Sequence, residues 1–107
     1  MKISRQCSIG AQRLATDGER GAHVAEILKA LAHPIRLRIV AILCEGDQHV
    51  SALAERLACK QAIVSQQLRI LRMRRLVAVV RRGGFSHYRL AEPRLRELVH
   101  CVAGCSV

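Results

Sequence analysis

Aromatic side chains are scarce in this sequence: Phe85 and Tyr88 are the only two, and tryptophan is absent. Proteins that bind RNA or single-stranded DNA stack successive bases on several aromatic rings. Two rings are too few for such a surface, so the composition argues against these two classes of partner. Double-stranded nucleic acid, which is recognised without stacking, remains open.

Long apolar runs are also missing. No segment approaches the length of about 20 residues that a membrane-spanning helix needs, and residues 1–6 lack the hydrophobic block of a signal peptide. We therefore expect a soluble, cytoplasmic protein without a membrane segment. The cysteines are odd in number and their spacing fits no secreted disulfide framework. Metal binding, redox chemistry or simple burial has to explain Cys7, Cys44, Cys59, Cys101 and Cys105.

Acidic residues are absent from one long segment. The chain of 107 residues has 18 Lys and Arg against 8 Asp and Glu, a net charge of +10. Residues 60–89 contain eight of the basic residues and no acidic one, whereas the rest of the chain is nearly balanced. A solvated surface has no reason to exclude acids over this length, but a surface that binds a phosphate backbone does. The charge distribution predicts a polyanion-binding surface within this segment.

The hydrophobic pattern predicts one small, mainly α-helical domain. Residues 1–17 show no steady period and are predicted to form a flexible N-terminal arm, so the folded domain spans residues 18–107. Apolar residues at helical spacing predict helices at about 21–34, 35–45, 52–57, 61–74 and 92–103, with Ser51 capping the third of them. Residues 76–81 and 86–90 are predicted strands, joined by a Gly83-Gly84 turn. The result is a helix-turn-helix followed by a β-hairpin.

The predicted helix at 61–74 has two distinct faces. Rotation by about 100° per residue brings Val64, Leu68 and Leu71 together on the side that faces the core. The other side has hydrogen-bonding groups and no carboxylate. Glutamine and arginine can each make two hydrogen bonds to a base edge in the major groove, and serine suits a phosphate oxygen. Together with the start of the helix and the hairpin, the predicted DNA-binding residues are Lys60, Gln61, Ser65, Gln66, Arg69, Arg72, Arg81 and Arg82.

Three segments resemble sequence motifs of the ArsR/SmtB family of bacterial repressors. Residues 31–40 (LAHPIRLRIV) match the family's LAHPxRLRIL, residues 61–71 (QAIVSQQLRIL) match QxxVSxHLxxL, and residues 81–90 (RRGGFSHYRL) match RRxGRxxxYxL. The resemblance implies a dimeric winged helix-turn-helix protein, mainly α with a small β-hairpin in the order α-α-α-α-β-β-α. It also implies that the first and last helices form the dimer, and that an inducer releases the repressor from its operator DNA.

The sequence departs from the family pattern at two places. The recognition helix usually begins with a capping serine, where this chain has Lys60, and the turn after it usually has AGL, where this chain has Arg74-Arg75-Leu76. A residue other than glycine is strained at positive φ, so we expect some strain in this turn. The exchange also adds two positive charges beside the predicted DNA-binding face.

The metal sites that the resemblance suggests are not present. The family's Cys-x-Cys in the third helix is absent, because residues 51–57 contain no cysteine. Another zinc site of the family begins with Asp-x-His at the start of the last helix, and this chain has Glu92-Pro93-Arg94 there. The five histidines show no ligand spacing, so we predict that they are structural.

The thiols are the remaining candidates for sensing. Cys101 and Cys105 lie four residues apart, hence on one side of the last helix, and two thiolates at this spacing can bind a soft ion such as arsenite, cadmium or lead. Cys44 is the candidate third ligand. In an alternative, peroxide or polysulfide oxidation links Cys44 to Cys101 or Cys105. We favour soft-metal or metalloid sensing over thiol redox sensing, and we expect DNA binding itself to require no cofactor.

Two further classes of protein compete with a repressor. A constitutive architectural protein would share the charge but need no inducer, and equal binding to unrelated duplexes would identify it. An enzyme with His100 and Cys101 as base and nucleophile is ruled out, because adjacent helical residues point about 100° apart. The sequence also lacks a glycine-rich phosphate loop and a pair of catalytic carboxylates. We therefore expect a homodimeric repressor of double-stranded operator DNA, not an enzyme.

Overall fold

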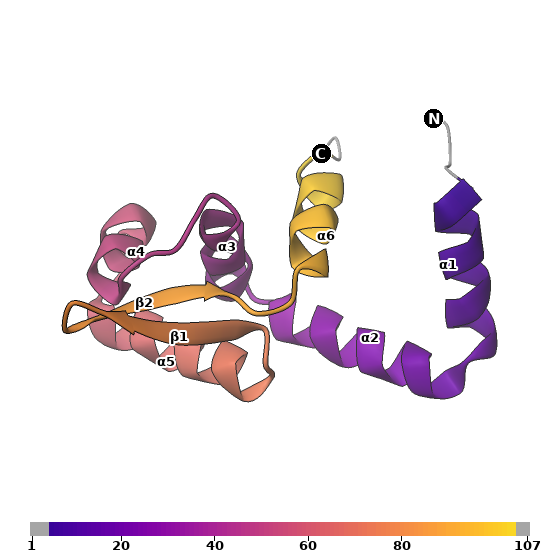
Figure 1. Ribbon diagram of the computed structural model, residues 1–107, viewed down its shortest axis with the longest axis horizontal. Coiled ribbons are helices and arrows are strands. Elements are labelled where there is room, and N and C mark those ends of the chain that lie inside the picture. The colour runs from indigo at the N-terminus through magenta and orange to yellow at the C-terminus, as the bar shows by residue number, and fades with distance from the viewer. Residues whose placement is uncertain (1–4, 105–107) are drawn as a thin grey trace.

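The computed structural model describes residues 5–104, with the side chains of residues 10–104. In Figure 1, α3, α4 and α5 surround a β-hairpin, α2 and α6 lie beside them, and α1 stands apart. None of the described helices is long and apolar enough to cross a membrane. The predicted mainly α architecture with a small hairpin is confirmed, with one more helix at its start. The described elements are α1 (Arg5–Thr16), α2 (Gly18–Leu31), α3 (Pro34–Leu43), α4 (Val50–Leu57), α5 (Gln61–Met73), β1 (Val77–Arg82), β2 (Phe85–Leu90) and α6 (Arg94–Ala103).

The first helix is the largest departure from the prediction. Residues 5–16 form α1, where the sequence predicted an irregular arm. Thr16 donates a hydrogen bond from Oγ1 to the carbonyl of Gln12 at 2.9 Å. Asp17 then caps α2 by accepting from the N–H of Arg20 at 3.1 Å, so α2 begins at Gly18, earlier than predicted. α1 contacts α2 where the two helices meet, and its described side chains from residue 10 to 16 are all exposed, so no buried apolar stripe marks it.

The core lies between α3 and the elements around it. α3 supplies Ile39, Val40 and Leu43, none of which is exposed, and is the buried centre that the sequence predicted. Among the described residues, every buried side chain is apolar, so burial of apolar surface is the main force that holds the elements together. The other fully or nearly fully buried side chains include Leu53, Leu57, Val64, Leu68, Leu71, Leu76, Val77 and Leu95.

The helix-turn-helix consists of α4, a short turn and α5. Ser51 does not cap α4 as predicted: the helix begins two residues earlier, at Val50, with His49 at the N-cap and no side-chain capping bond. The turn contains Ala58 in the left-handed conformation, with φ of 53°. Lys60 is the N-cap residue of α5 and makes no side-chain capping bond either, in line with the loss of the family's capping serine.

The β1–β2 hairpin forms the wing. Arg82 pairs with Phe85 across the antiparallel strands, which leaves a two-residue turn, Gly83-Gly84. Both glycines have positive φ, 56° and 80°, which suits glycine and matches the twist of a hairpin. The predicted hairpin and its turn are confirmed.

The loop before α4 is attached to the wing. Gln48 forms a β-bridge with Tyr88, with backbone hydrogen bonds of 3.0 and 2.7 Å. Beside it, Asp47 Oδ2 lies 2.9 Å from Arg89 Nη2. The wing therefore has a fixed position relative to the helix-turn-helix.

The turn after α5 has the strained backbone that the sequence predicted. Arg75, where the family pattern has glycine, has a φ of 61°. We expect Arg75→Gly to raise the free energy of unfolding by about 0.5–1 kcal/mol, because glycine adopts this conformation without a steric cost. Chemical denaturation measures the change. Ala22→Gly, at an exposed site within α2, should instead lower the free energy of unfolding by about 1 kcal/mol. If Arg75→Gly lowers the free energy of unfolding as much as Ala22→Gly does, the backbone at Arg75 is not strained.

Candidate nucleic-acid interface and thiol sites

The outward side of α5 presents the side chains predicted to contact DNA. Val64, Leu68 and Leu71 are completely buried and anchor the helix on the core. A helix anchored along one stripe can offer its opposite side to a groove. The exposed residues on that side are Gln61, Ser65, Gln66, Arg69 and Arg72.

The wing and the start of α5 add positive charge. Arg81 and Arg82 are exposed at the end of β1, and Lys60 is exposed before α5. Within the described part of the chain, the ion pairs involve none of these three cations, nor Arg69 or Arg72. Because no described carboxylate neutralises them, these cations are available to phosphate groups.

Two other cations of the acid-free segment have partners inside the chain. Arg74 Nη1 lies 2.9 Å from Oε2 of Glu26 in α2, and Arg89 is paired with Asp47 at the base of the wing. The count of eight basic residues therefore overstates the charge directed at a polyanion. These pairs could not be predicted from the sequence, because their partners lie 48 and 42 residues away.

The described thiols lie at three separate places. Cys101 is exposed on α6, Cys44 is half-buried at the end of α3, and Cys59 is half-buried in the turn before α5. Arg96 in α6 donates from Nε to the carbonyl of Cys44 at 3.3 Å, so the end of α3 adjoins the start of α6. Cys101 follows Arg96 by five residues, which is about 7.5 Å along the helix axis. Cys44 therefore adjoins the opposite end of α6 from Cys101.

Metal-ligating side chains are dispersed in the described part of the chain, which contains no group of three or more Cys, His, Asp or Glu residues that could hold a metal ion. α6 ends at Ala103, and Cys105 lies outside the described residues. The predicted pairing of Cys101 with Cys105 therefore stays a prediction.

Three histidines have structural contacts that the sequence pattern did not reveal. The Nδ1 atom of His33 accepts from the N–H of Ile35 at 3.2 Å and caps α3. The rings of His49 and His87 lie side by side, with centroids 4.2 Å apart. The β-bridge next to them brings the two rings together, a contact that their spacing in the sequence could not indicate.

Burial raises the pKa of the Cys44 thiol above its usual value, while the Arg96 cation opposes this and the Glu45 carboxylate adds to it. The thiol is therefore protonated at neutral pH and becomes a thiolate only in alkaline solution. We expect Arg96→Gln to move the pH midpoint of Cys44 alkylation by iodoacetamide upwards, measured by mass spectrometry. Arg94→Gln removes a charge that does not act on this thiol and should leave the midpoint unchanged; a lower midpoint for Arg96→Gln would contradict the prediction.

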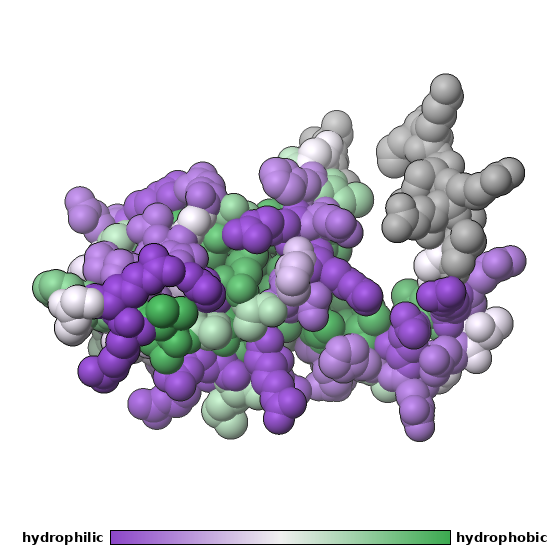
Figure 2. Space-filling view, viewed as in Figure 1, coloured by the Kyte–Doolittle hydropathy of each residue, from purple (hydrophilic) through white to green (hydrophobic). Residues whose placement is uncertain are grey.

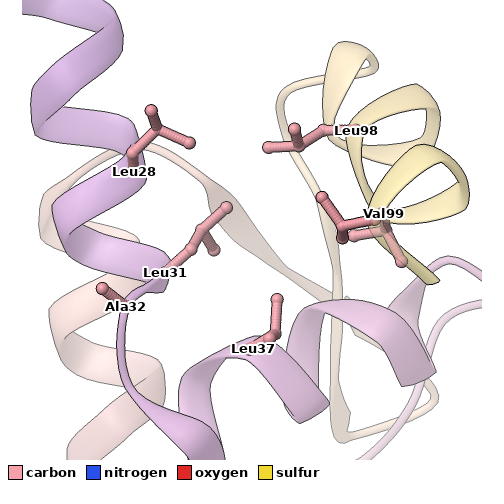
Figure 3. A pocket seen from close by; sticks show the side chains of 7 residues that line it. Leu28, Leu31, Ala32, Leu37, Leu98 and Val99 are labelled. Atoms are coloured by element: carbon pink, nitrogen blue, oxygen red, sulfur yellow. The ribbon is translucent and has the colours of Figure 1, made fainter. Parts of the chain in front are cut away.

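An apolar groove lies between α2, α3 and α6. Figure 3 shows Leu28 and Leu31 of α2 directed toward Leu98 and Val99 of α6. Figure 2 shows hydrophobic residues reaching the surface in the middle of an otherwise mainly hydrophilic face. The apolar side chains that line such an exposed groove can be covered by a protein partner. The groove encloses about 220 Å³ and is lined by Leu28, Leu31, Ala32, Leu37, Leu98, Val99 and Val102.

Comparison with known proteins identifies the family. Residues 33–79 match the model of the bacterial regulatory proteins of the arsR family. The chain is 34% identical over 100 residues to the biofilm growth-associated repressor of Agrobacterium fabrum, a match that covers 94% of this chain and 86% of that protein. The chain belongs to the ArsR family. As an ArsR-family member it is a DNA-binding transcriptional repressor and not an enzyme.

Solved structures of similar proteins share the architecture. The crystal structure of the transcriptional repressor BigR from Xylella fastidiosa has a TM-score of 0.71 at 34% identity, over 83% of this chain and 94% of that chain. A homodimeric winged helix-turn-helix DNA-binding domain from Mycobacterium bovis, described as a possible ArsR-family regulator, has a TM-score of 0.70 at 31% identity, over 83% and 86% of the two chains. The predicted winged helix-turn-helix fold is thereby confirmed.

Proposed function

We propose that two copies of this ArsR-family chain bind one operator, with the α5 helices in successive major grooves. Gln61, Gln66 and Arg69 then contact base edges, whereas Ser65 and Arg72 contact phosphates. Lys60, Arg81 and Arg82 add phosphate contacts from the ends of α5 and β1. The observation that carries this proposal is the set of exposed cations without described acidic partners on α5 and the wing.

The apolar groove supports a homodimer. Leu28, Leu37 and Val102 are 48%, 39% and 45% exposed in the single chain, and a second copy of α2 and α6 would remove this apolar surface from water. The homodimeric domain of the relative from Mycobacterium bovis is in keeping with this arrangement. A dimer with twofold symmetry favours an imperfect palindrome with half-sites about 10 base pairs apart.

Substitutions on α5 and on the wing test the proposed DNA contacts. Gln66→Ala or Arg69→Ala should each cost about 1–3 kcal/mol of operator binding and relax the base preference, because each removes contacts to base edges. Arg82→Ala should weaken binding to all duplexes alike and lower the salt dependence, because it removes a phosphate contact. Footprinting and fluorescence anisotropy on operator and scrambled duplexes measure these effects. An unchanged footprint in both α5 variants would mean that another face contacts the bases.

We further propose that the C-terminal thiols bind the inducer. Cys101 and Cys105 would hold a soft ion such as arsenite, cadmium or lead as thiolates. Cys44 was the candidate third ligand from the sequence, but its place at the opposite end of α6 from Cys101 does not support that role within one chain. The exposure of Cys101 on α6, a helix that borders the apolar groove, favours this site. Binding there would alter the dimer rather than the DNA-contacting face.

Two alternatives use the same fold. Oxidation by peroxide or polysulfide could link Cys44 to Cys101 or Cys105, and a constitutive architectural protein would use no inducer at all. Operator release in the presence of arsenite, cadmium, lead, zinc, peroxide or polysulfide separates them. Release by a soft ion supports the proposal, release by an oxidant supports the redox alternative, and no release combined with equal binding to unrelated duplexes supports the architectural one.

A further inference from the structure

An ion pair joins the end of the recognition helix to the helix proposed to form the dimer. Arg74 is the C-cap residue of α5, and its Nη1 atom lies 2.9 Å from Oε2 of Glu26 in α2. The other oxygen of Glu26 lies 3.5 Å from Nζ of Lys29. The Glu26 carboxylate therefore contacts Lys29 within α2 through one oxygen and Arg74 at the end of α5 through the other.

This pair lies beside an open cleft. A cavity of about 250 Å³ lies between α2 and the end of α5, lined by His23, Glu26, Ile27 and Arg74. A second cavity of about 230 Å³ extends toward Arg75, the residue with the strained backbone. Because this cleft separates the side chains of α2 from the end of α5, the ion pair is a contact that can fix the distance between the two helices.

We infer that the Glu26–Arg74 ion pair positions the recognition helix relative to the dimer helix. In a dimer, the position of α5 against α2 sets the separation of the two recognition helices and hence the fit to both half-sites. Arg74 is then a positioning residue and not a phosphate contact, and a shift of α2 on inducer binding would reach α5 through this pair. The inference rests on the proposed dimer and its operator binding.

Glu26→Gln tests the inference, because simple electrostatics and positioning predict different ratios of operator affinity to unrelated-duplex affinity. Removing an acid beside a basic face should tighten binding to every duplex alike and leave this ratio unchanged. If the pair positions α5, Glu26→Gln should lower the ratio of operator affinity to unrelated-duplex affinity by about threefold to tenfold, since each dimer loses two exposed pairs. The salt dependence of operator binding should stay unchanged, because no phosphate contact is lost. Fluorescence anisotropy over a range of salt concentrations measures both quantities.

The charge-swapped variant Glu26→Arg with Arg74→Glu distinguishes positioning from phosphate binding. Positioning predicts that the restored pair returns the affinity ratio to within about twofold of the parent, since both ions remain half-exposed. A phosphate contact by Arg74 predicts instead that the swap binds worse than Glu26→Gln and lowers the salt slope by about 1 per subunit.

The control is Glu45→Gln, which removes the similarly exposed pair between Glu45, just after α3, and Arg56 of α4. It should leave the affinity ratio unchanged, and thermal unfolding shows that each variant is folded. An unchanged ratio in Glu26→Gln, or a swap that fails to rescue, overturns the inference. A parent protein that does not prefer any operator over unrelated DNA overturns the proposed function instead.

Discussion

Replacing Leu28 by glutamate is expected to split the dimer into monomers and to lower operator affinity by about a hundredfold or more. Leu28 is 48% exposed on α2 and lines the apolar groove (Figure 3). A carboxylate at this position would be buried without a partner in the proposed interface, and a monomer cannot hold two half-sites at once. Sedimentation velocity at micromolar concentration measures the oligomeric state, and fluorescence anisotropy measures the affinity.

Met73 provides the matched control for this prediction. It is 77% exposed at the end of α5 and does not line the groove. Met73→Glu should therefore sediment like the parent. A Leu28→Glu variant that remains dimeric would show that the groove is not the interface, and a monomeric parent would contradict the dimer itself.

The double variant Cys101→Ser, Cys105→Ser is expected to bind the operator like the parent and to remain bound when inducer is added. Serine keeps the approximate size of each side chain but is not a soft ligand. Cys101 lies on α6, whereas the exposed cations of α5 and the wing are on other elements, so sensing and DNA binding should separate. A coupling of about 1–3 kcal/mol between the two sites is enough for a fivefold or larger loss of operator affinity.

Cys59→Ser is the control for the thiol prediction, because Cys59 is a half-buried thiol in the turn before α5. This variant should bind the operator and release it when inducer is added. If the double variant also releases the operator when inducer is added, sensing involves other thiols, and Cys7 and Cys44 are the next candidates. If the double variant cannot bind DNA, its cysteines are structural.

Local patterns in the sequence predicted the parts of the fold whose cause is local. Helical spacing identified Val64, Leu68 and Leu71 as the buried stripe of α5, and all three are completely buried. The Gly83-Gly84 pair predicted a two-residue turn, and both glycines have positive φ in the structure. The missing family glycine predicted strain at Arg75, which has a φ of 61°. In each case the residue type and its immediate neighbours decide the conformation.

Where several residues compete locally, the sequence was less informative. Ser51 is a better capping residue than His49, yet α4 begins after His49 because the bridge between Gln48 and Tyr88 fixes the chain just before it. Asp17 caps α2, so this helix starts earlier than its apolar period indicates. For α4, a tertiary contact of the preceding loop therefore decides which residue is the N-cap.

Long-range polar contacts could not be predicted at all. The Glu26–Arg74 and Asp47–Arg89 pairs and the neighbouring His49 and His87 rings join residues from distant parts of the chain. Spacing along the sequence carries no information about such contacts until the fold is known. The basic residues of 60–89 could be assigned to a polyanion as a group, but the structure was needed to separate the internally paired cations from the available ones.

The β-bridge at Gln48 also bears on self-association through the sheet. A two-stranded hairpin has two open edges, each of which could pair with a strand of another molecule and begin aggregation. Gln48 occupies part of the outer edge of β2 by pairing with Tyr88, and β1 ends in two exposed arginines, Arg81 and Arg82. Like charges on approaching strands repel each other. The wing can therefore extend toward DNA as a hairpin while both of its edges disfavour the strand-to-strand pairing that leads to fibres.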